Sequence, residues 1–170
     1  MNLTQEKMKK KYLYFAFMAM FSFVAYGQST ASHTVKIIAH PILELKFDNS
    51  FNKTEFNFNT VSDYDNGKTN LEAVGLKVRS NKKWVISVKA GSQTFLSDNS
   101  DVTEILSKSL QVRKTGTQET VAIETFEQAI ASGNSGGFDQ NKVILDYIAN
   151  PGYIKPNSYS IEITYTLTTP

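Results

Sequence analysis

Apolar and polar side chains alternate strictly over residues 159–168, and this pattern constrains the fold more than any other feature. The apolar row is Tyr159, Ile161, Ile163, Tyr165 and Leu167, and Ser, Glu or Thr stands at each position between them. Successive side chains of a β-strand point to opposite faces. The segment is therefore expected to be an antiparallel strand with one buried face and one wet face.

The same period of two recurs along the chain. Residues 73–90 show two alternating runs around the polar stretch Ser80–Lys83, which is typical of a β-hairpin. Shorter alternating runs predict strands at residues 55–59, 110–112 and 143–147. Residues 35–47 alternate as well, but Pro41 interrupts them, which favours a first strand that changes sheets at the proline.

Two stretches carry helical signals. Asp101 and Glu104 have capping-box spacing before Ile105, and residues 124–131 place Phe126 and Ile130 four apart. With one or two short helical turns among many strands, the chain is expected to be all-β. The predicted architecture is a single antiparallel, Ig-like or Greek-key β-sandwich of about seven or eight strands. Polar connections at residues 61–70 and 92–101 fit the crossings of such a fold.

The first 27 of the 170 residues have the form of a secretory signal peptide. Four lysines precede an uncharged apolar run over residues 12–25, and Ala25 and Gly27 supply small residues for cleavage before Gln28. As a helix this run would span roughly 21 Å, less than the ~30 Å apolar core of a bilayer. The alternative is an uncleaved membrane anchor. The interpretation predicts a signal peptide over 1–27, one sandwich domain over 28–170 and no transmembrane helix in the mature chain.

Charge and composition exclude several function classes. The net charge of the whole chain is +2, but residues 28–170 hold fourteen basic and fifteen acidic residues, a balance of −1. Such a domain has no electrostatic footprint for nucleic acid. The chain has no cysteine, so disulfides, thiolate metal sites and lipid attachment at a cysteine are excluded.

No catalytic constellation is visible. The histidines, His33 and His40, have no carboxylate at ligand spacing, and Ser135 lies in a glycine-rich loop without a G-x-S-x-G elbow. A phosphate cradle and a dinucleotide fingerprint are absent as well. The chain is therefore expected to be no enzyme and to need no cofactor.

Acidic residues offer at most a weak metal site. The stretch Asp63–Gly67 lacks the glycine and glutamate positions of a calcium-binding EF-hand loop and is explained by a turn. Asp98, Asp101 and Glu104 are weak Ca²⁺ candidates, because helix capping already accounts for two of them.

Aromatic residues offer another kind of site. Trp84 is expected to be a core anchor, since it stands in an apolar row. Tyr64, Phe138 and Tyr153 fall in predicted loops, where exposed rings can bind a glycan or a peptide, although single exposed aromatics are common.

Two parts of the chain carry a family resemblance. They are Leu76–Asn81 with Trp84–Val88, and the ending from Leu145 through Pro151-Gly152 to Thr168. In these the chain resembles small secreted β-sandwich proteins of Bacteroidetes-type bacteria and, more distantly, pilin-like spore-coat-U domains. Pro156-Asn157-Ser158 stands where the pilin-like domains usually have a glycine, and their frequent disulfide is absent. The resemblance implies an exported structural or adhesive role and carries over no active-site residue.

The leading hypothesis is an exported, non-enzymatic structural, adhesive or accessory subunit of the cell envelope of a Gram-negative bacterium. It would act through contacts with other envelope proteins or copies of itself, in the periplasm or at the outer-membrane surface. An edge strand can accept a partner strand, and Val35, Ile37 and Ala39 are the candidate exchanging residues. The alternative is a secreted module that binds a glycan or peptide through loops at one end of the sandwich.

Overall fold

A computed structural model describes residues 27–98 and 103–170. The predicted signal peptide up to residue 26, and Asp101 with its predicted capping box, lie outside these residues. Residues 39–170 belong to one compact unit, and residues 27–38 are separate from it. Among the described residues, no helix has the length and apolar character needed to cross a membrane.

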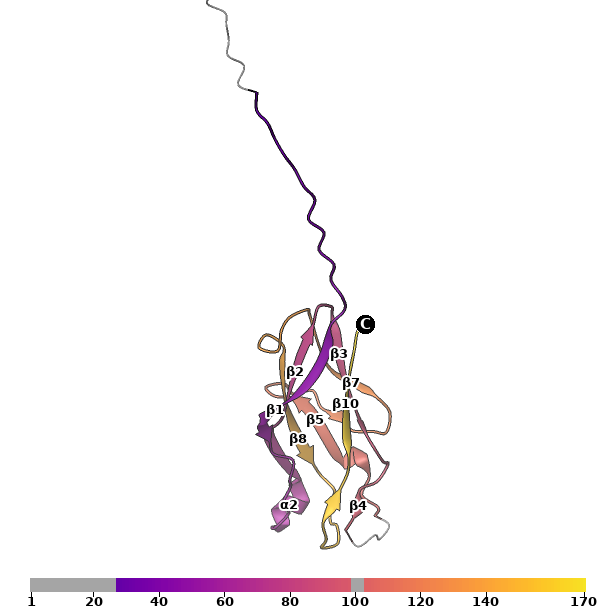
Figure 1. Cartoon of the computed structure of the whole chain (residues 1–170). Helices are drawn as coiled ribbons and strands as arrows, with labels where there is room; N and C mark the ends of the chain where they lie inside the picture. Colours follow the sequence, from indigo (N-terminus) through magenta and orange to yellow (C-terminus); the bar gives the residue numbers. More distant parts are fainter. Residues whose placement is uncertain (1–26, 99–102) are drawn as a thin grey trace, which may run out of the picture. The chain divides into compact units, whose positions relative to one another are not determined.

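The described strands form two main antiparallel sheets (Figure 1). In order across the larger sheet they are β1 (Leu43–Asn52), β2 (Lys68–Ser80), β8 (Lys142–Ala149), β5 (Leu110–Lys114) and β6 (Val121–Ala122). Across the smaller sheet they are β10 (Ile163–Thr168), β3 (Trp84–Ala90) and β7 (Gln128–Gly133). Two short strands, β4 (Leu96–Ser97) and β9 (Tyr159–Ser160), form a separate antiparallel pair. The all-β sandwich predicted from the alternating pattern is confirmed.

The hydrophobic core forms where the two sheets face each other. Leu76 and Leu145 from the larger sheet and Ile86 and Val88 from the smaller sheet are all completely buried in one cluster. Every second residue of β3 is buried, which is the pattern of a strand with one face on the core. The predicted role of Trp84 is confirmed: the residue is buried, and its Nε1 donates to the carbonyl oxygen of Asn134 over 2.9 Å.

The predicted hairpin over residues 73–90 is wrong, although both of its strands exist. β2 pairs with β1 and β8, whereas β3 pairs with β10 and β7. The polar stretch after β2 therefore connects the two sheets. Ser80 stabilises the turn of the chain in this link, because its hydroxyl donates to the carbonyl of Lys82 and accepts from the Lys82 N–H.

The alternation at residues 159–168 is confirmed, but the segment is two strands. Tyr159–Ser160 pairs with β4, and Ile163–Thr168 pairs with β3. Between them the carbonyl of Glu162 accepts from the N–H of Gly91 over 2.8 Å, just after β3 ends. At this point the pairing of the segment changes from β4 to β3, while its apolar side chains stay on one face.

Two further expectations are corrected. A helix is expected at residues 124–131, but residues 128–133 form the strand β7. This strand pairs with the edge of β3 that β10 leaves free. Val61–Asn66 is a short helix, α2, and residues 68–70 already belong to β2. The predicted crossing at residues 61–70 is therefore part of the link between β1 and β2, two neighbouring strands of one sheet. Outside the strands, Ser107–Ser109 forms a single 3-10 turn, η1.

The first predicted strand also begins later than expected. Residues 27–42 are exposed and contain no strand. Asn81 fixes the point where the chain enters β1: its Oδ1 accepts from the Ile42 N–H over 3.0 Å, and its Nδ2 donates to the His40 carbonyl over 2.8 Å. Pro41 lies between these two residues and has no N–H to contribute to a ladder. The strand therefore starts at Leu43.

A buried carboxylate fixes an irregularity in β2. The pairing of β2 with β8 shifts register between Asn70 and Val74, and Glu72 within this bulge has a φ of 53°. Asp146 of β8 accepts from the Glu72 N–H over 2.9 Å and from Arg113 Nε over 2.9 Å. Because non-glycine residues seldom adopt such a φ, this network holds a conformation that the chain alone would not favour.

Candidate binding groove

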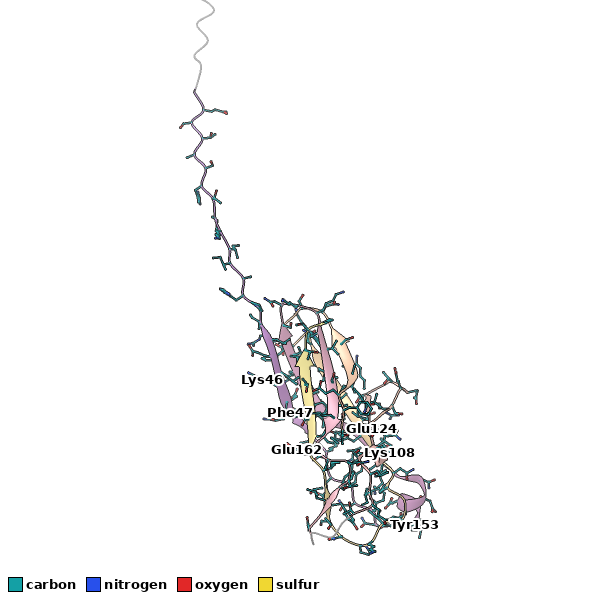
Figure 2. All side chains as sticks on the ribbon, turned by 90° about the vertical axis from the view of Figure 1, so that its right-hand side faces the viewer. Lys46, Phe47, Lys108, Glu124, Tyr153 and Glu162 are labelled. Atoms are coloured by element: carbon teal, nitrogen blue, oxygen red, sulfur yellow. The ribbon has the colours of Figure 1, made fainter. Side chains whose placement is uncertain are left out.

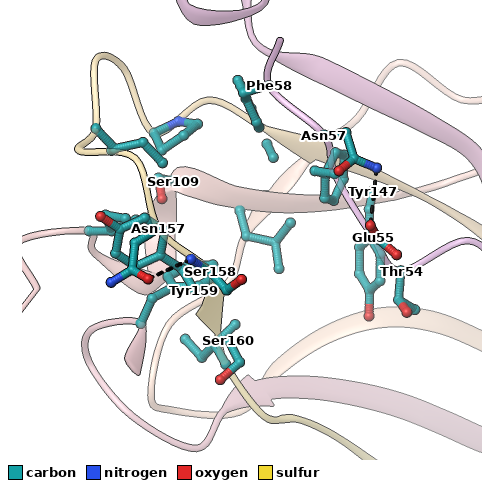
Figure 3. A pocket seen from close by; sticks show the side chains of 18 of the residues that line it. Thr54, Glu55, Asn57, Phe58, Ser109, Tyr147, Asn157, Ser158, Tyr159 and Ser160 are labelled. Atoms are coloured by element: carbon teal, nitrogen blue, oxygen red, sulfur yellow. Dashed lines mark hydrogen bonds between the residues drawn. The ribbon is translucent and has the colours of Figure 1, made fainter. Parts of the chain in front are cut away.

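A groove of about 850 Å³ opens on the side of the sandwich where β1 and β10 are the outer strands. One wall is the segment 54–59, and the other is the segment 154–161 that leads into β10. Figure 3 shows Thr54, Glu55, Asn57 and Phe58 on one side and Asn157 to Ser160 on the other. The groove therefore lies between two connecting segments, above strands of both sheets.

The first wall continues from β1 but is no longer a strand. Asn70 Nδ2 donates to the backbone carbonyls of Lys53 and Glu55, each over 2.9 Å. The Asn70 side chain thus bonds carbonyls that could otherwise accept hydrogen bonds from a neighbouring strand. Residues 53–59 remain outside the hydrogen-bond ladder of the sheet. The strand predicted at residues 55–59 is therefore wrong, while its apolar side chains Phe56 and Phe58 still pack against the core.

The floor of the groove contains a contact between the two sheets. The hydroxyl oxygens of Tyr147 in β8 and Tyr165 in β10 lie 2.6 Å apart. Burial raises the pKa of Tyr165, and the adjacent Tyr147 raises it further. Burial also raises the pKa of Tyr147, against the opposing effect of its hydrogen bond to Tyr165. Both hydroxyls are therefore neutral at physiological pH and act as a hydrogen-bonded pair.

The lining of the groove is mostly aromatic and aliphatic. Phe47, labelled in Figure 2, stands at its rim with 62% of its surface exposed. Its ring meets that of Tyr165 edge to face, with the ring centroids 6.1 Å apart. Glu55 and Lys155 are the charged residues among those that line it. Such a surface suits an apolar chain segment or the flat face of a sugar better than a charged ligand.

Two of the three predicted ligand-loop aromatics meet at the end of the sandwich. The rings of Tyr64 and Tyr153 stack with centroids 5.5 Å apart and an angle of 16° between their planes. Tyr64 stands in α2, not in a loop, and its hydroxyl donates to the carbonyl of Phe58 over 3.2 Å. Tyr153 is 73% exposed and donates to Asp65 Oδ1 over 2.7 Å, a bond that raises the pKa of its hydroxyl. Tyr153 therefore presents an oriented ring to solvent.

α2 owes its form to a capping box. Thr60 accepts from the Asp63 N–H over 3.2 Å, while the Asp63 carboxylate accepts from the Thr60 N–H over 3.0 Å. Backbone N–H groups of Asn59 and Thr60, and then Lys68, lower the pKa of Asp63 to about 2. The stretch Asp63–Gly67, expected to be a turn, thus forms most of a helix that ends at Gly67, whose φ is 71°.

Phe138 does not join the other two aromatics. Its ring lies beneath two cations of the larger sheet, with Arg79 Cζ 4.1 Å and Lys46 Nζ 4.8 Å from the ring centroid. These distances are those of cation–π contacts. Phe138 is thus accounted for by packing against β1 and β2.

The other predicted site residues lie as follows. Val35, Ile37 and Ala39 are exposed, with Val35 at 73% and Ile37 at 87%. Among the weak Ca²⁺ candidates, Asp98 and Glu104 are exposed and Asp101 lies outside the described residues. Within residues 27–98 and 103–170, no three His, Asp or Glu side chains gather closely enough to hold a metal ion.

Comparison with known proteins assigns the chain to no family. No protein-family model matches it, and no curated protein matches it. The function of the chain is therefore inferred from the geometry of residues 27–98 and 103–170.

Sequence reasoning missed the groove and its central residues. Phe47 continues the apolar row of Leu43 and Leu45 and is expected to be buried, yet β1 is an outer strand and most of the Phe47 surface is exposed. The Tyr147–Tyr165 pair could be suspected from two tyrosines on the apolar faces of predicted strands, since a buried tyrosine hydroxyl needs a partner. Alternation alone does not reveal that the two are partners.

Proposed function

We propose that the chain is an exported, non-enzymatic structural subunit of the bacterial cell envelope that assembles by donating its N-terminal segment to a partner protein. The observation that carries this proposal is the state of residues 28–42, hereafter the arm. Residues 27–42 are exposed and contain no strand, and the arm exposes Val35, Ile37, Ile38 and Ile42. Apolar side chains in such number are normally covered by something.

The arm has the composition of a strand that lacks a sheet. Val35, Ile37 and Ala39 would lie on one face of an extended segment, with Lys36 and His40 on the other. Burying one Val or Ile side chain contributes roughly 1.5–3 kcal/mol, so two such residues with a strand's hydrogen bonds supply a substantial gain in binding free energy. The signal-like segment before the arm supports export to the periplasm or the cell surface.

The proposal is tested by comparing two arm variants in protein extracted from its native envelope. Val35→Asp/Ile37→Asp places charges on the apolar face, and Thr34→Asp/Lys36→Asp places the same number of carboxylates on the other face. Assemblies are detected as bands on a denaturing gel that disappear when the sample is heated. We expect the first variant to lose them and the second to keep them. Intact assembly after deletion of residues 28–40 would refute the proposal.

A second candidate function is glycan binding at the end of the sandwich. The observation that favours it is the exposed Tyr153 ring, oriented by its stack on Tyr64 and its bond to Asp65. Sugar rings bind flat on such aromatic faces. Tyr153→Ala is expected to abolish adhesion to a glycan array, Tyr153→Phe to retain most of it, and Phe138→Ala, which alters a ring elsewhere, to leave it unchanged. Equal adhesion by all three variants would rule this function out.

A further inference from the structure

The groove leads from the surface into the space between the two sheets. Its charged residues, Glu55 on one wall and Lys155 on the other, are both exposed and belong to its mouth. Val74, Leu110 and Tyr147 also line it, and all three are buried members of the core cluster. Its volume of about 850 Å³ lies in the range of about 300–1,000 Å³ that small-molecule sites occupy. The groove thus has the depth, size and apolar interior of a ligand site.

Aromatic rings are concentrated along the groove. They supply eight of the 26 residues that line it, whereas aromatic residues make up 12% of the whole chain. The eight are Phe47, Phe56, Phe58, Tyr64, Phe95, Tyr147, Tyr159 and Tyr165. Aromatic side chains pack against other rings by offset stacking or edge to face. A flat, ring-shaped ligand without charge therefore suits this interior best.

The two tyrosine hydroxyls at the floor of the groove offer one proton more than they use. Each hydroxyl carries one proton, and the contact of 2.6 Å between Tyr147 and Tyr165 takes up one of the two. Neither hydroxyl makes a second hydrogen bond with a described residue. Tyr147 is only 5% exposed, and a buried donor without an acceptor costs free energy. The pair is therefore a hydrogen-bond donor directed at whatever lies in the groove.

We infer that the groove binds a small, uncharged, flat aromatic ligand that carries a carbonyl oxygen. The carbonyl accepts the second proton of the Tyr147–Tyr165 pair, and the ring system packs among the aromatic side chains of the interior. A carbonyl oxygen suits the pair because it accepts a proton and brings none that would need an acceptor of its own. This binding activity is separate from the proposed assembly through the arm and does not depend on it.

Fluorenone and fluorene are matched probes for this site, because they share one flat ring skeleton and only fluorenone has a carbonyl group. Each is titrated against the purified full chain, and its affinity is measured by displacement of the uncharged dye Nile red. In Tyr147→Phe/Tyr165→Phe the preference for fluorenone over fluorene should fall roughly threefold to tenfold, the worth of one neutral hydrogen bond. The same preference in the wild type and in this variant would overturn the inference.

The single variants separate the hydrogen bond from a change in packing. Tyr147→Phe and Tyr165→Phe each keep one hydroxyl, whose proton is no longer shared with a second tyrosine. Each single variant should therefore keep the preference for fluorenone that the double variant loses. If both single variants lose it as fully as the double variant does, disturbed packing accounts for the loss and the inference fails.

A second pair of variants tests whether the probes bind in the groove. Phe47→Asp places a carboxylate at the rim and should weaken the binding of Nile red and of both probes several-fold. Leu96→Asp, at an equally exposed residue outside the groove, should leave all three affinities unchanged. Equal binding by these two variants would place the probes elsewhere on the protein and overturn the inference. Because no partner protein takes part in these titrations, their failure leaves the structural-subunit proposal untouched.

Discussion

The hydroxyl groups of Tyr147 and Tyr165 join the two sheets of the sandwich across 2.6 Å at the floor of the groove. Tyr147 belongs to β8, near the centre of the larger sheet, and Tyr165 belongs to β10, an outer strand of the smaller one. The pair therefore holds the last strand against the rest of the fold at the place where the sandwich is open.

This pair should show strong coupling in a double-mutant cycle. Replacing one tyrosine by phenylalanine leaves the other buried hydroxyl without its partner, which costs about 1–3 kcal/mol in the free energy of unfolding. The Tyr147→Phe/Tyr165→Phe variant loses both groups and should be less destabilised than the sum of the single variants, by about 1 kcal/mol. Urea unfolding measures all four proteins. Single effects that simply add would show that the hydroxyls do not stabilise each other.

The same pair predicts a loss of stability at alkaline pH. The folded-state pKa of each tyrosine lies above the ordinary value of 10.0, so the pair's contribution is fully present below that pH. As pH rises above 10, the unfolded chain loses these protons first, and the free energy of unfolding falls. Thermal melts between pH 8 and pH 11 should show a steeper decline for the wild type than for the double phenylalanine variant. Parallel declines would contradict this origin.

Among the carboxylates of the described residues, Asp146 should contribute most to the free energy of unfolding. Burial of its carboxyl opposes ionisation, but bonds from Thr115, the Glu72 N–H and Arg113 outweigh it and hold the pKa below its ordinary value of 3.8. Asp146→Asn removes the charge that Arg113 pairs with and weakens the support of the bulge at Glu72. We expect a loss of about 2–3 kcal/mol in urea unfolding. Glu44→Gln, which alters the exposed pair with Arg79, should cost less than about 1 kcal/mol.

The contribution of Asp146 to stability should also be lost in acid. Because the folded-state pKa of Asp146 is lowered, its contribution is complete above pH 3.8 and is lost as pH falls through the folded-state value. Between pH 5 and pH 2 the wild type should therefore lose more stability than Asp146→Asn. If the difference between the two proteins does not change over that range, the carboxylate does not stabilise the fold through its charge.

The alternation of apolar and polar residues predicts which segments are strands, but not which strands pair with one another. Alternation located β2, β3, β5, β8 and the two parts of the last strand, because it depends only on which face of a strand is buried. It could not show that β2 and β3 lie in different sheets, since a short polar stretch serves equally as a hairpin turn or as a link between sheets. The spacing of Phe126 and Ile130 suited a helix, but β3 offered a free edge that a helix could not bond.

The candidate groove was still harder to anticipate. It depends on β1 and β10 both being outer strands on the same side, which is a property of strand order and not of any local motif. The arm, by contrast, was visible in the sequence as an apolar alternating run ending at Pro41. The expectation that it forms part of the first strand was wrong, because no neighbouring strand among the described residues pairs with it.

A glycine beside the single tryptophan supplies the last prediction. A Cβ added at Gly133 in β7 would lie 2.2 Å from Cζ2 of Trp84, its cross-strand neighbour. Gly133→Ala must therefore displace the buried indole and strain its bond to the Asn134 carbonyl, at a cost of about 1–3 kcal/mol. The fluorescence of Trp84 should shift to longer wavelength as water reaches the ring. Gly137→Ala is the matched control, because a Cβ there would meet no atom within 4 Å. If the two alanine variants have the same stability and emission, the packing of Trp84 on Gly133 does not constrain the sandwich.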